Sequence, residues 1–341
     1  MARKKTKVTL EDVATLADVS VATVHRVINE VDSVNGELGQ RVQRAIKELG
    51  FTPKRSKTRT KPPVVAMIVP EFLDPANAMI MAGAQEESAK LNIRLVILPV
   101  DEKPDNQKEN LIQLKQMTID AIVLLHLQIT PNEVFDLCRQ APVPLVQLGV
   151  ISDVPDVHCI DMDRESGMYQ AAKYLIGLGH TKLAYISGPL ELSYSEARLH
   201  GIKRALTEAG LSLSSDVHRW CLPTIEEGFH AANNLLQLPQ NQRPTAILTF
   251  NDLIAIGTLH AARASGLVVP TDLSVIGSGN ILFTVHTNPP LTTIDQHKYH
   301  MGRLAIQKLY RTLGGYTSEH KGTTLLECPL VVRESTGPCP Q

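Results

Sequence analysis

The chain has 341 residues, 43% of them hydrophobic and 4% aromatic, which suits two or three globular domains with aliphatic cores. No apolar run reaches the roughly 18 residues of a membrane-spanning helix, and the basic N-terminus lacks a signal peptide's apolar core, so we expect a cytoplasmic protein without membrane contact. The five cysteines form no CxxC pair and the twelve histidines show no ligand spacing, so neither a metal site nor a disulfide framework is indicated.

The charge distribution separates a basic end from an acidic remainder. The formal net charge is −1, but residues 1–62 hold 13 basic and 7 acidic side chains, whereas the remainder holds 21 basic and 28 acidic ones. A positive balance confined to one end is typical of phosphate binding there. A solvated basic tail has the same charge and is the alternative on this evidence alone.

Residues 1–50 have the pattern of three short helices. Thr9 is a candidate N-cap with Asp12 three positions later, and apolar residues follow at helical spacing. Ser20 can cap a second helix that runs from Val21 to about Asn29. Asp18 stands in the short turn between them, where many such units have a glycine with positive φ.

A third amphipathic helix is expected next, capped by Ser33 or Asn35, with an apolar stripe from Leu38 to Leu49 and Gly50 as its C-cap. Three helices of this size bury little surface. Such a unit serves mainly to present its second helix to the major groove of DNA. A small helical protein-interaction module is the alternative.

The sequence of this head closely resembles the head of the LacI/GalR family. The matching stretches are Thr9–Ala14 and Val19–Asn29, with His25 where the family usually has serine. The resemblance implies that Val21, Ala22 and Arg26 face base edges. Arginine can pair with guanine, and small apolar side chains can contact a thymine methyl group. The resemblance further implies phosphate-binding or helix-supporting roles for Thr9, Ser20, Thr23, His25 and Asn29.

Residues 51–63 are basic, end in two prolines and are expected to form a linker. In the resembled family this stretch becomes a hinge helix on DNA that wedges a leucine into the minor groove. Here Thr60 occupies the leucine position, and Lys57-Thr58 replaces the usual Ala-Arg. We therefore expect mainly phosphate contacts, with less DNA kinking than in the family, or a flexible tether that contributes charge alone. The candidate linker contacts are Lys54, Arg55 and Lys57.

From residue 64 to about 336, strand-like apolar runs alternate with helical segments. This alternation predicts parallel sheets covered by helices, with enough residues for two lobes whose ligand lies beyond the carboxyl ends of the strands. The predicted strands are Val64–Val69, Arg94–Val100, Ala121–Leu125, Leu145–Leu148, Lys182–Ser187, Ala246–Phe250 and Leu273–Ile276. The predicted helices lie near Asn77–Leu91, Asn106–Met117, Gly167–Leu178, Glu196–Ala209, Glu226–Gln237 and Asp252–Ala264.

This region also resembles the LacI/GalR regulators, and the periplasmic sugar-binding proteins that share the same body. The matching stretches are Leu178–His180, Ser187–Leu190, Arg198–Gly201, Phe250–Gly257, Gly266–Gly277 and Pro290–Gln296. The resemblance implies a small all-α helix-turn-helix DNA-binding domain at 1–50, a hinge at 51–63, and an α/β two-lobed periplasmic-binding-protein-like domain with parallel sheets at 64–336. Lobe 1 is expected near 64–162 and 296–324, and lobe 2 near 163–293 and 325–336.

The resemblance places a small-molecule effector between the lobes. Arg198 matches the family's ligand-contacting arginine, and Asn251 and Gln296 match polar pocket positions. Ala76 and Asn77 stand where many members have aromatic residues. A surface salt bridge is the alternative role for Arg198.

Two pocket aspartates of the family are replaced here, by Gly149 and Gly279. Paired carboxylates normally bind sugar hydroxyls, so their absence beside a retained arginine favours an anionic or phosphorylated metabolite over a neutral sugar. The effector class therefore spans a sugar, a sugar acid or a phosphorylated metabolite, and no other cofactor is expected. His126, near a strand end, could line the cleft, and a packed core histidine is at least as good an alternative. The candidate effector-binding residues are Ala76, Asn77, His126, Arg198, Asn251, Asn280 and Gln296.

No catalytic constellation is found: GxSxG, a phosphate-binding loop and GxGxxG after the first strand are missing, and His180 looks structural. The sequence thus predicts a ligand-responsive DNA-binding transcriptional regulator rather than an enzyme, a repressor of a carbohydrate or related small-metabolite operon. We expect a homodimer on a pseudo-palindromic double-stranded operator, and no tetramer, because the C-terminal tail carries no heptads. The rival functions are a transport-system binding protein and an α/β enzyme with a helical appendage.

Overall fold

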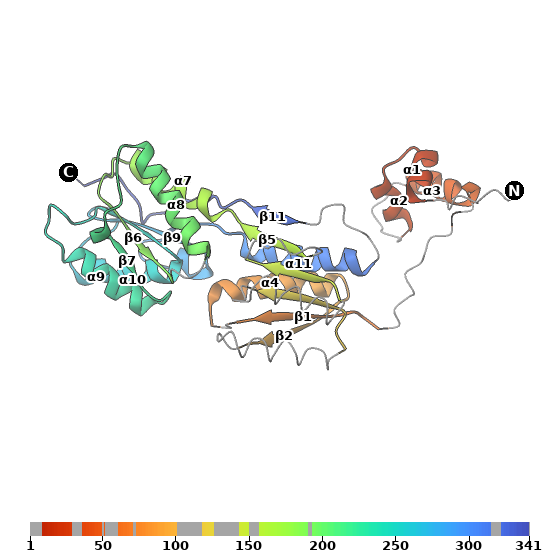
Figure 1. Cartoon of the computed structure of the whole chain (residues 1–341), viewed down its shortest axis with the longest axis horizontal. Helices are drawn as coiled ribbons and strands as arrows, with labels where there is room; N and C mark the ends of the chain where they lie inside the picture. The colour runs from red at the N-terminus through yellow and green to blue at the C-terminus, as the bar shows by residue number, and fades with distance from the viewer. Residues whose placement is uncertain are drawn as a thin grey trace. The chain divides into compact units, whose positions relative to one another are not determined.

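The computed structural model describes residues 9–28, 36–49, 51, 61–70, 73–100, 118–125, 143–149, 157–189, 193–314 and 322–340. Contacts divide the chain into two units, Met1–Thr60 and Lys61–Gln341, which we call the head and the body (Figure 1). Several predictions lie outside the described residues: the caps Ser33, Asn35 and Gly50, the linker residues 52–60, the helix near 106–117, and His126. Among the described helices, none has the length and apolar character needed to cross a bilayer.

The head contains the three predicted helices α1 (Leu10–Ala17), α2 (Val21–Ile28) and α3 (Gly36–Leu49). The Thr9 hydroxyl accepts from the Asp12 N–H at 3.3 Å, and the Asp12 carboxylate accepts from the Thr9 N–H at 2.8 Å. This reciprocal pair satisfies backbone donors that the first helical turn leaves free. Asp18 ends α1 with a φ of 49°, so the left-handed turn expected at this position is confirmed.

Six buried apolar side chains hold the three helices of the head together. Val24 projects from α2 and is 0% exposed, between Val13 of α1 and Val42 of α3 in one cluster. The cluster also contains Ala14, Ala17 and Ala45. With so few members, each large side chain carries much of the stability of the head.

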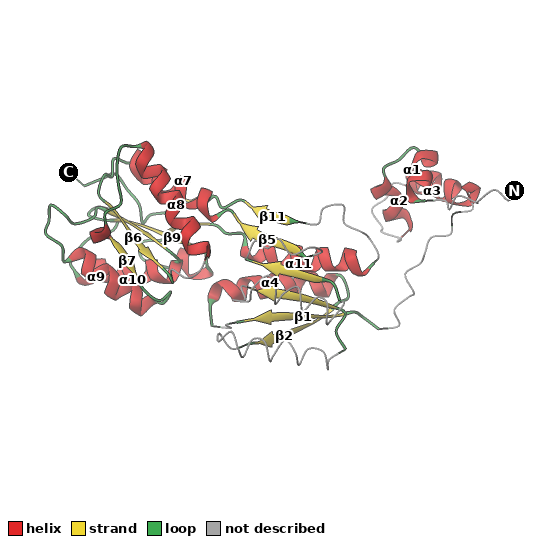
Figure 2. Cartoon of the chain, viewed as in Figure 1, coloured by secondary structure: helices red, strands yellow, loops and turns green. Residues whose placement is uncertain are grey.

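Within the described part of the body, the strands form two sheets of six strands each (Figure 2). The first has the order β11-β5-β4-β3-β1-β2, and all of its pairs are parallel. Its strands are β1 (Val64–Val69), β2 (Arg94–Pro99), β3 (Ala121–Leu125), β4 (Leu145–Leu148), β5 (His158–Met162) and β11 (Thr323–Leu326). The fold class predicted from the sequence is confirmed by this architecture together with the helical head.

The second sheet has the order β12-β10-β9-β8-β6-β7 and is parallel except for the pair β10–β12. Its strands are β6 (Leu183–Ser187), β7 (His218–Trp220), β8 (Ala246–Thr249), β9 (Ser274–Ser278), β10 (Thr292–Ile294) and β12 (Leu330–Val331). Two short 3-10 segments, Ser215–Val217 and Leu282–Val285, lie in its loops.

Helices pack in pairs against these sheets. On the first sheet α4 (Pro75–Lys90) lies along α11 (Lys298–Leu313). On the second, α7 (Arg164–Gly177) pairs with α8 (Ser193–Glu208), and α9 (Ile225–Leu236) pairs with α10 (Asp252–Ala264). Side chains alternate between the two faces of each strand, so Tyr185 of β6 joins the cluster of α7 and α8 while Ile186 joins that of α9 and α10.

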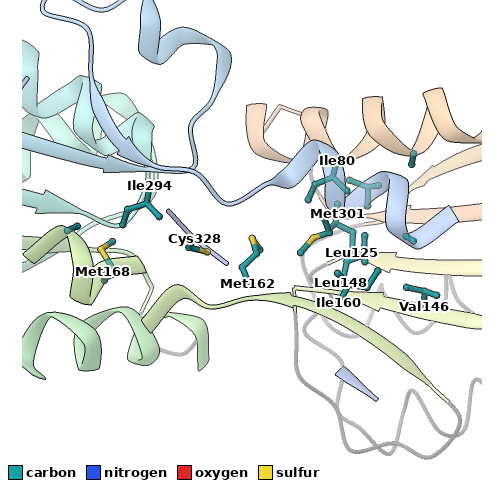
Figure 3. Close-up of a cluster of buried hydrophobic side chains, with 14 of the residues drawn as sticks. Ile80, Leu125, Val146, Leu148, Ile160, Met162, Met168, Ile294, Met301 and Cys328 are labelled. Atoms are coloured by element: carbon teal, nitrogen blue, oxygen red, sulfur yellow. The ribbon is translucent and has the colours of Figure 1, made fainter. Parts of the chain in front are cut away.

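The chain passes between the two sheets three times, after β5, after β10 and after β11. We call residues 161–164, 294–298 and 326–330 the crossing region. Figure 3 shows Met162 and Cys328 between apolar residues of the two lobes, and one buried cluster includes Ile294 of β10 and Met301 of α11 as well. The apolar core is therefore continuous through the crossing region.

Glycines allow the paired helices to approach closely. A Cβ atom on Gly302 of α11 would overlap the carbonyl oxygen of Ile80 in α4, and one on Gly83 would overlap the carbonyl oxygen of Tyr299. Backbone atoms cannot move aside as the end of a flexible side chain can. The α4–α11 contact therefore requires both positions to lack a side chain.

The structure adds elements that the sequence analysis did not predict, chiefly β5 and α11. It also moves several helix starts: α4 begins at Pro75, two residues before the predicted start, because Asp74 caps it by accepting from the Ala76 N–H at 2.8 Å. Likewise Asp163 caps α7 through the Ser166 N–H, so this helix begins at Arg164.

Candidate functional site

The amino-terminal end of α2 is exposed on the head. Val21 is 38% exposed, and the Ser20 hydroxyl both accepts from the Thr23 N–H at 3.1 Å and lies 2.9 Å from the Thr23 hydroxyl. Val24, one turn further along α2, is fully buried and anchors the helix in the core of the head. The structure thus brings Ser20, Val21 and Thr23 together, with Thr9 exposed at the start of α1. Ala22, His25 and Arg26 lie on α2 without described side chains, and Asn29, Lys54, Arg55 and Lys57 lie outside the described residues.

A contact missed by the sequence analysis holds the turn before α2. The Arg41 guanidinium of α3 donates to the Asp18 carbonyl at 2.9 Å and to its carboxylate at 3.0 Å. The pair is largely exposed, so its contribution to stability is modest. Its geometric effect is to tie the left-handed turn to α3, which orients the exposed end of α2.

Arg198 is buried in the body at 5% exposure, so its alternative role as a surface salt bridge is wrong. It projects from α8, and its guanidinium carbon lies 4.3 Å from the ring centroid of Phe250, which follows β8. A guanidinium held over an aromatic face keeps a fixed orientation.

The predicted polar residues of the body lie at the ends of strands and helices, and several of them form hydrogen bonds within the chain. Gln296 is buried in the crossing region and donates to the Ser278 hydroxyl at 2.9 Å. Asn251 caps α10, since its side-chain oxygen accepts from the Ile254 N–H at 2.9 Å. Asn280 has a φ of 51° and accepts from the Arg333 guanidinium at 2.7 Å. Asn77 is buried in the first turn of α4, beside the partly exposed Ala76.

Buried charges gather in the crossing region. Arg164 donates to Asp161 at 2.6 Å in a pair that is almost fully buried. Lys298 begins α11, and the charges of Asp74, Arg164, Arg198 and Asp252 all act on its ammonium. The thiol of Cys328 is subject to the charges of Arg164, Arg198 and Lys298 as well. Residues far apart in sequence thus meet around this region, although local patterns pointed only to Arg198 and Gln296.

Comparison with known proteins finds matches to both the head and the body. The model of the family described as bacterial regulatory proteins, lacI family, matches residues 9–54, and that of a periplasmic binding protein-like domain matches residues 172–336. The HTH-type transcriptional repressor CytR of Escherichia coli (strain K12) is 33% identical over 99% of both chains. The repressor PurR of Histophilus somni is 32% identical over 96% of this chain and 98% of its own.

The chain belongs to the LacI family of bacterial regulatory proteins.

Solved structures of LacI-family members have the same fold. The transcriptional regulator CelR in complex with cellobiose has a TM-score of 0.72 and 31% identity, covering 96% of this chain and 99% of its own. The lac repressor dimer bound to operator and the anti-inducer ONPF also has a TM-score of 0.72, with 26% identity over 97% of this chain and 100% of its own.

Two positions where this LacI-family chain lacks an expected aspartate have backbone reasons for glycine. Gly279 has a φ of 137°, and a Cβ atom there would lie 3.0 Å from the Asp252 carboxylate. Gly149 has a φ of 78°, and its carbonyl accepts from Arg164 at 3.4 Å. An L-side chain at either position is strained.

The buried carboxylate of Asp252 lies beside Gly279. It accepts from the Thr293 hydroxyl and from the Ile281 N–H at 2.9 Å, and so ties α10 to β10 and to the loop after β9. Burial raises its pKa to about 6, although these hydrogen bonds and the charges of Lys298 and Arg333 act in the opposite direction. The ionised form is therefore costly in the folded body.

We predict that the body gains stability through Asp252 as the pH falls from 7 to 5. The folded pKa of about 6 exceeds the ordinary value of 3.8, so the folded state takes up the proton first and gains about 1 kcal/mol over this interval. The gain is complete below the unfolded pKa and is lost as the pH rises through 6. Urea unfolding of wild type and Asp252→Asn at both pH values measures it.

The Asp252→Asn protein should lack this increment, whereas Asp216→Asn, a change at an exposed carboxyl, should keep it. Equal pH dependence in the wild type and Asp252→Asn would show that this carboxyl is already ionised at no cost.

His180 has the structural role indicated by its sequence context. One ring nitrogen lies 2.9 Å from the Thr245 hydroxyl, and the other lies 3.0 Å from the Ser274 hydroxyl and 3.1 Å from the Gly337 carbonyl. Burial lowers its pKa, so the neutral ring is favoured. Among the described residues, no group of three or more His, Cys, Asp or Glu side chains could hold a metal ion.

Proposed function

We propose that this protein is a ligand-responsive transcriptional repressor whose head binds a double-stranded operator. The observation that carries the proposal is the exposed end of α2, where Ser20 and Val21 are exposed and Thr23 is partly exposed while Val24 anchors the helix. A helix presented in this way fits the major groove. Its role is regulatory rather than catalytic, and it is exercised in the cytoplasm, where the DNA is.

We propose further that it acts as a homodimer on a pseudo-palindromic site. A two-fold dimer presents two equivalent heads, and these match two half-sites of opposite orientation. The lac repressor, similar to this chain over its whole length, was solved as a dimer bound to operator. The division into head 1–50, hinge 51–63 and two lobes over 64–336 belongs to this proposal, as do the assigned DNA-binding residues of head and linker.

The proposed effector is a small metabolite that binds at the crossing region and regulates a carbohydrate or related small-metabolite operon. The support is the group of buried polar and charged side chains there, including Arg198 and Gln296. The regulator CelR, which this chain resembles, was solved with cellobiose. To control DNA binding, the effector must bind two arrangements of the body with unequal affinity.

Selection of genomic DNA fragments by the purified protein tests the proposal. We expect enrichment of one pseudo-palindromic sequence, with affinity that falls steeply as salt rises. In Arg26→Ala, specificity should relax at one base pair of each half-site at a cost of about 1–3 kcal/mol.

Arg44→Ala is the matched control, because Arg44 is an exposed arginine on α3 rather than on α2. It should weaken binding uniformly across sequences, if at all, without relaxing specificity. Failure to enrich any sequence, with candidate metabolites both present and absent, would overturn the proposed function.

A further inference from the structure

Lys298 is a buried cation that has no hydrogen-bond or ion-pair partner among the described residues. It is 7% exposed, and within the part of the chain that the structure describes its ammonium makes no hydrogen bond or ion pair. Burial lowers its pKa to about 8, so the group is still mostly charged at neutral pH. A buried charge in proteins is normally paired, because taking it out of water is costly. Asp74 and Asp252 act on the Lys298 ammonium at longer range, but no described carboxylate is in ion-pair contact with it.

The helix that Lys298 begins has an uncapped amino terminus. The preceding residue, His297, has a φ of 47° and gives α11 no side-chain cap. Its own N–H donates to the Asp295 carboxylate at 2.8 Å, which engages that carboxylate outside the helix. The first backbone N–H groups of this 16-residue helix thus carry partial positive charge in the same turn as Lys298.

The other charged groups near Lys298 are already engaged in contacts within the protein. Arg164 is paired with Asp161, so that pair contributes little net charge. Asp252 uses its carboxylate oxygens to accept from Thr293 and Ile281. Arg198, in the second lobe, adds a positive charge. Asp74, in the first lobe, acts on the Lys298 ammonium and also caps α4. Among the described residues, the Lys298 ammonium and the first N–H groups of α11 therefore remain as unused hydrogen-bond donors at the start of this helix.

We propose that the amino-terminal end of α11, with Lys298 at its first position, binds the oxyanion group of the effector. This inference rests on the proposed function and defines the class of its ligand: a sugar acid or a sugar phosphate rather than a neutral sugar. Backbone N–H groups at a helix start and an ammonium together form an anion site of the kind that binds phosphate and carboxylate. Because Lys298 follows Gln296 in a crossing segment, the oxyanion contacts the body where the two lobes join.

Isothermal titration calorimetry of the full-length protein tests the subsite, at constant ionic strength in chloride buffer. The probes are inorganic phosphate, glucose 6-phosphate, gluconate and glucose. We expect the wild type to bind inorganic phosphate and at least one of the two anionic sugars, and to bind glucose more weakly. Comparison of glucose 6-phosphate with gluconate then separates a phosphate from a carboxylate ligand.

Lys298→Met keeps the length of the side chain but removes its charge, and should weaken anion binding about tenfold to hundredfold. Lys298→Arg should restore much of it. Lys308→Met is the matched control: it lies on the same helix, partly buried, about 15 Å further along, and should bind anions as the wild type does. Circular dichroism establishes that each variant is folded.

Equal anion affinity of the wild type and Lys298→Met would overturn the inference, and so would the absence of any anion binding by the wild type. Binding to the selected DNA fragment is measured on the same preparations. If the wild type binds DNA but the anion site fails, only this inference is wrong. If it binds no DNA with sequence preference, the proposed function fails instead.

Discussion

A Val24→Asn protein is expected to bind its operator about 40-fold more weakly than the wild type, while its body stays folded. Val24 is fully buried among the three helices of the head. The change removes apolar burial and places an amide in the core, at a cost of about 3–5 kcal/mol. A head of about fifty residues has only a few kcal/mol of stability to lose.

The size of the effect follows from the population of folded heads. If the unfolded head is favoured by about 1 kcal/mol, each head is folded roughly one-sixth of the time, and a dimer needs both. Fluorescence anisotropy with the selected operator measures the affinity, and calorimetry follows the unfolding of the body. Leu16→Asn is the control, because Leu16 on α1 is 44% exposed and the same change there costs little. Wild-type affinity in Val24→Asn would mean that the described head core is not what holds α2 in place.

A Gly302→Ala protein is expected to unfold at a temperature about 6–12 °C below the wild type. The new Cβ atom would overlap the Ile80 carbonyl oxygen, so α4 and α11 must separate. Overpacking against a backbone costs about 3 kcal/mol, and a body of this size loses about 2–4 °C per kcal/mol. Differential scanning calorimetry measures the shift in the body transition.

The matched control is the same substitution at Gly177, the last residue of α7. A Cβ atom there meets nothing within 4 Å, and alanine is the better helix former, so the melting temperature should stay equal or rise slightly. Should Gly302→Ala behave like Gly177→Ala, the close approach of α4 and α11 is not present in solution.

Sequence patterns predict those strands and helices whose own residues show a clear apolar run or an amphipathic repeat. Strands β1, β3 and β4 and helix α10 have the predicted bounds, because each is an apolar run or an amphipathic segment with clear ends. Strand β5 was not predicted because His158 and Asp161 interrupt its apolar run. The structure buries both, and Asp161 is accommodated by Arg164.

Helix α11 could have been predicted, since Met301, Ile306 and Leu309 lie at helical spacing and face the core. Its polar first turn concealed where it begins. The charged group around Lys298 has no local signal, because Arg164, Arg198 and Lys298 are far apart in sequence and meet only through the crossing of the chain. A motif can indicate Arg198 as a candidate, but it does not show which charges will surround it.

The late position of α11, β11 and β12 in the chain has a consequence for synthesis on the ribosome. Strand β11 completes the edge of the first sheet, β12 that of the second, and α11 covers α4. Neither lobe can close until these segments have emerged, whereas the contacts of the head lie within the first sixty residues. During translation the part that reads DNA can therefore mature before the part that governs it, at a stage when both lobes are still open.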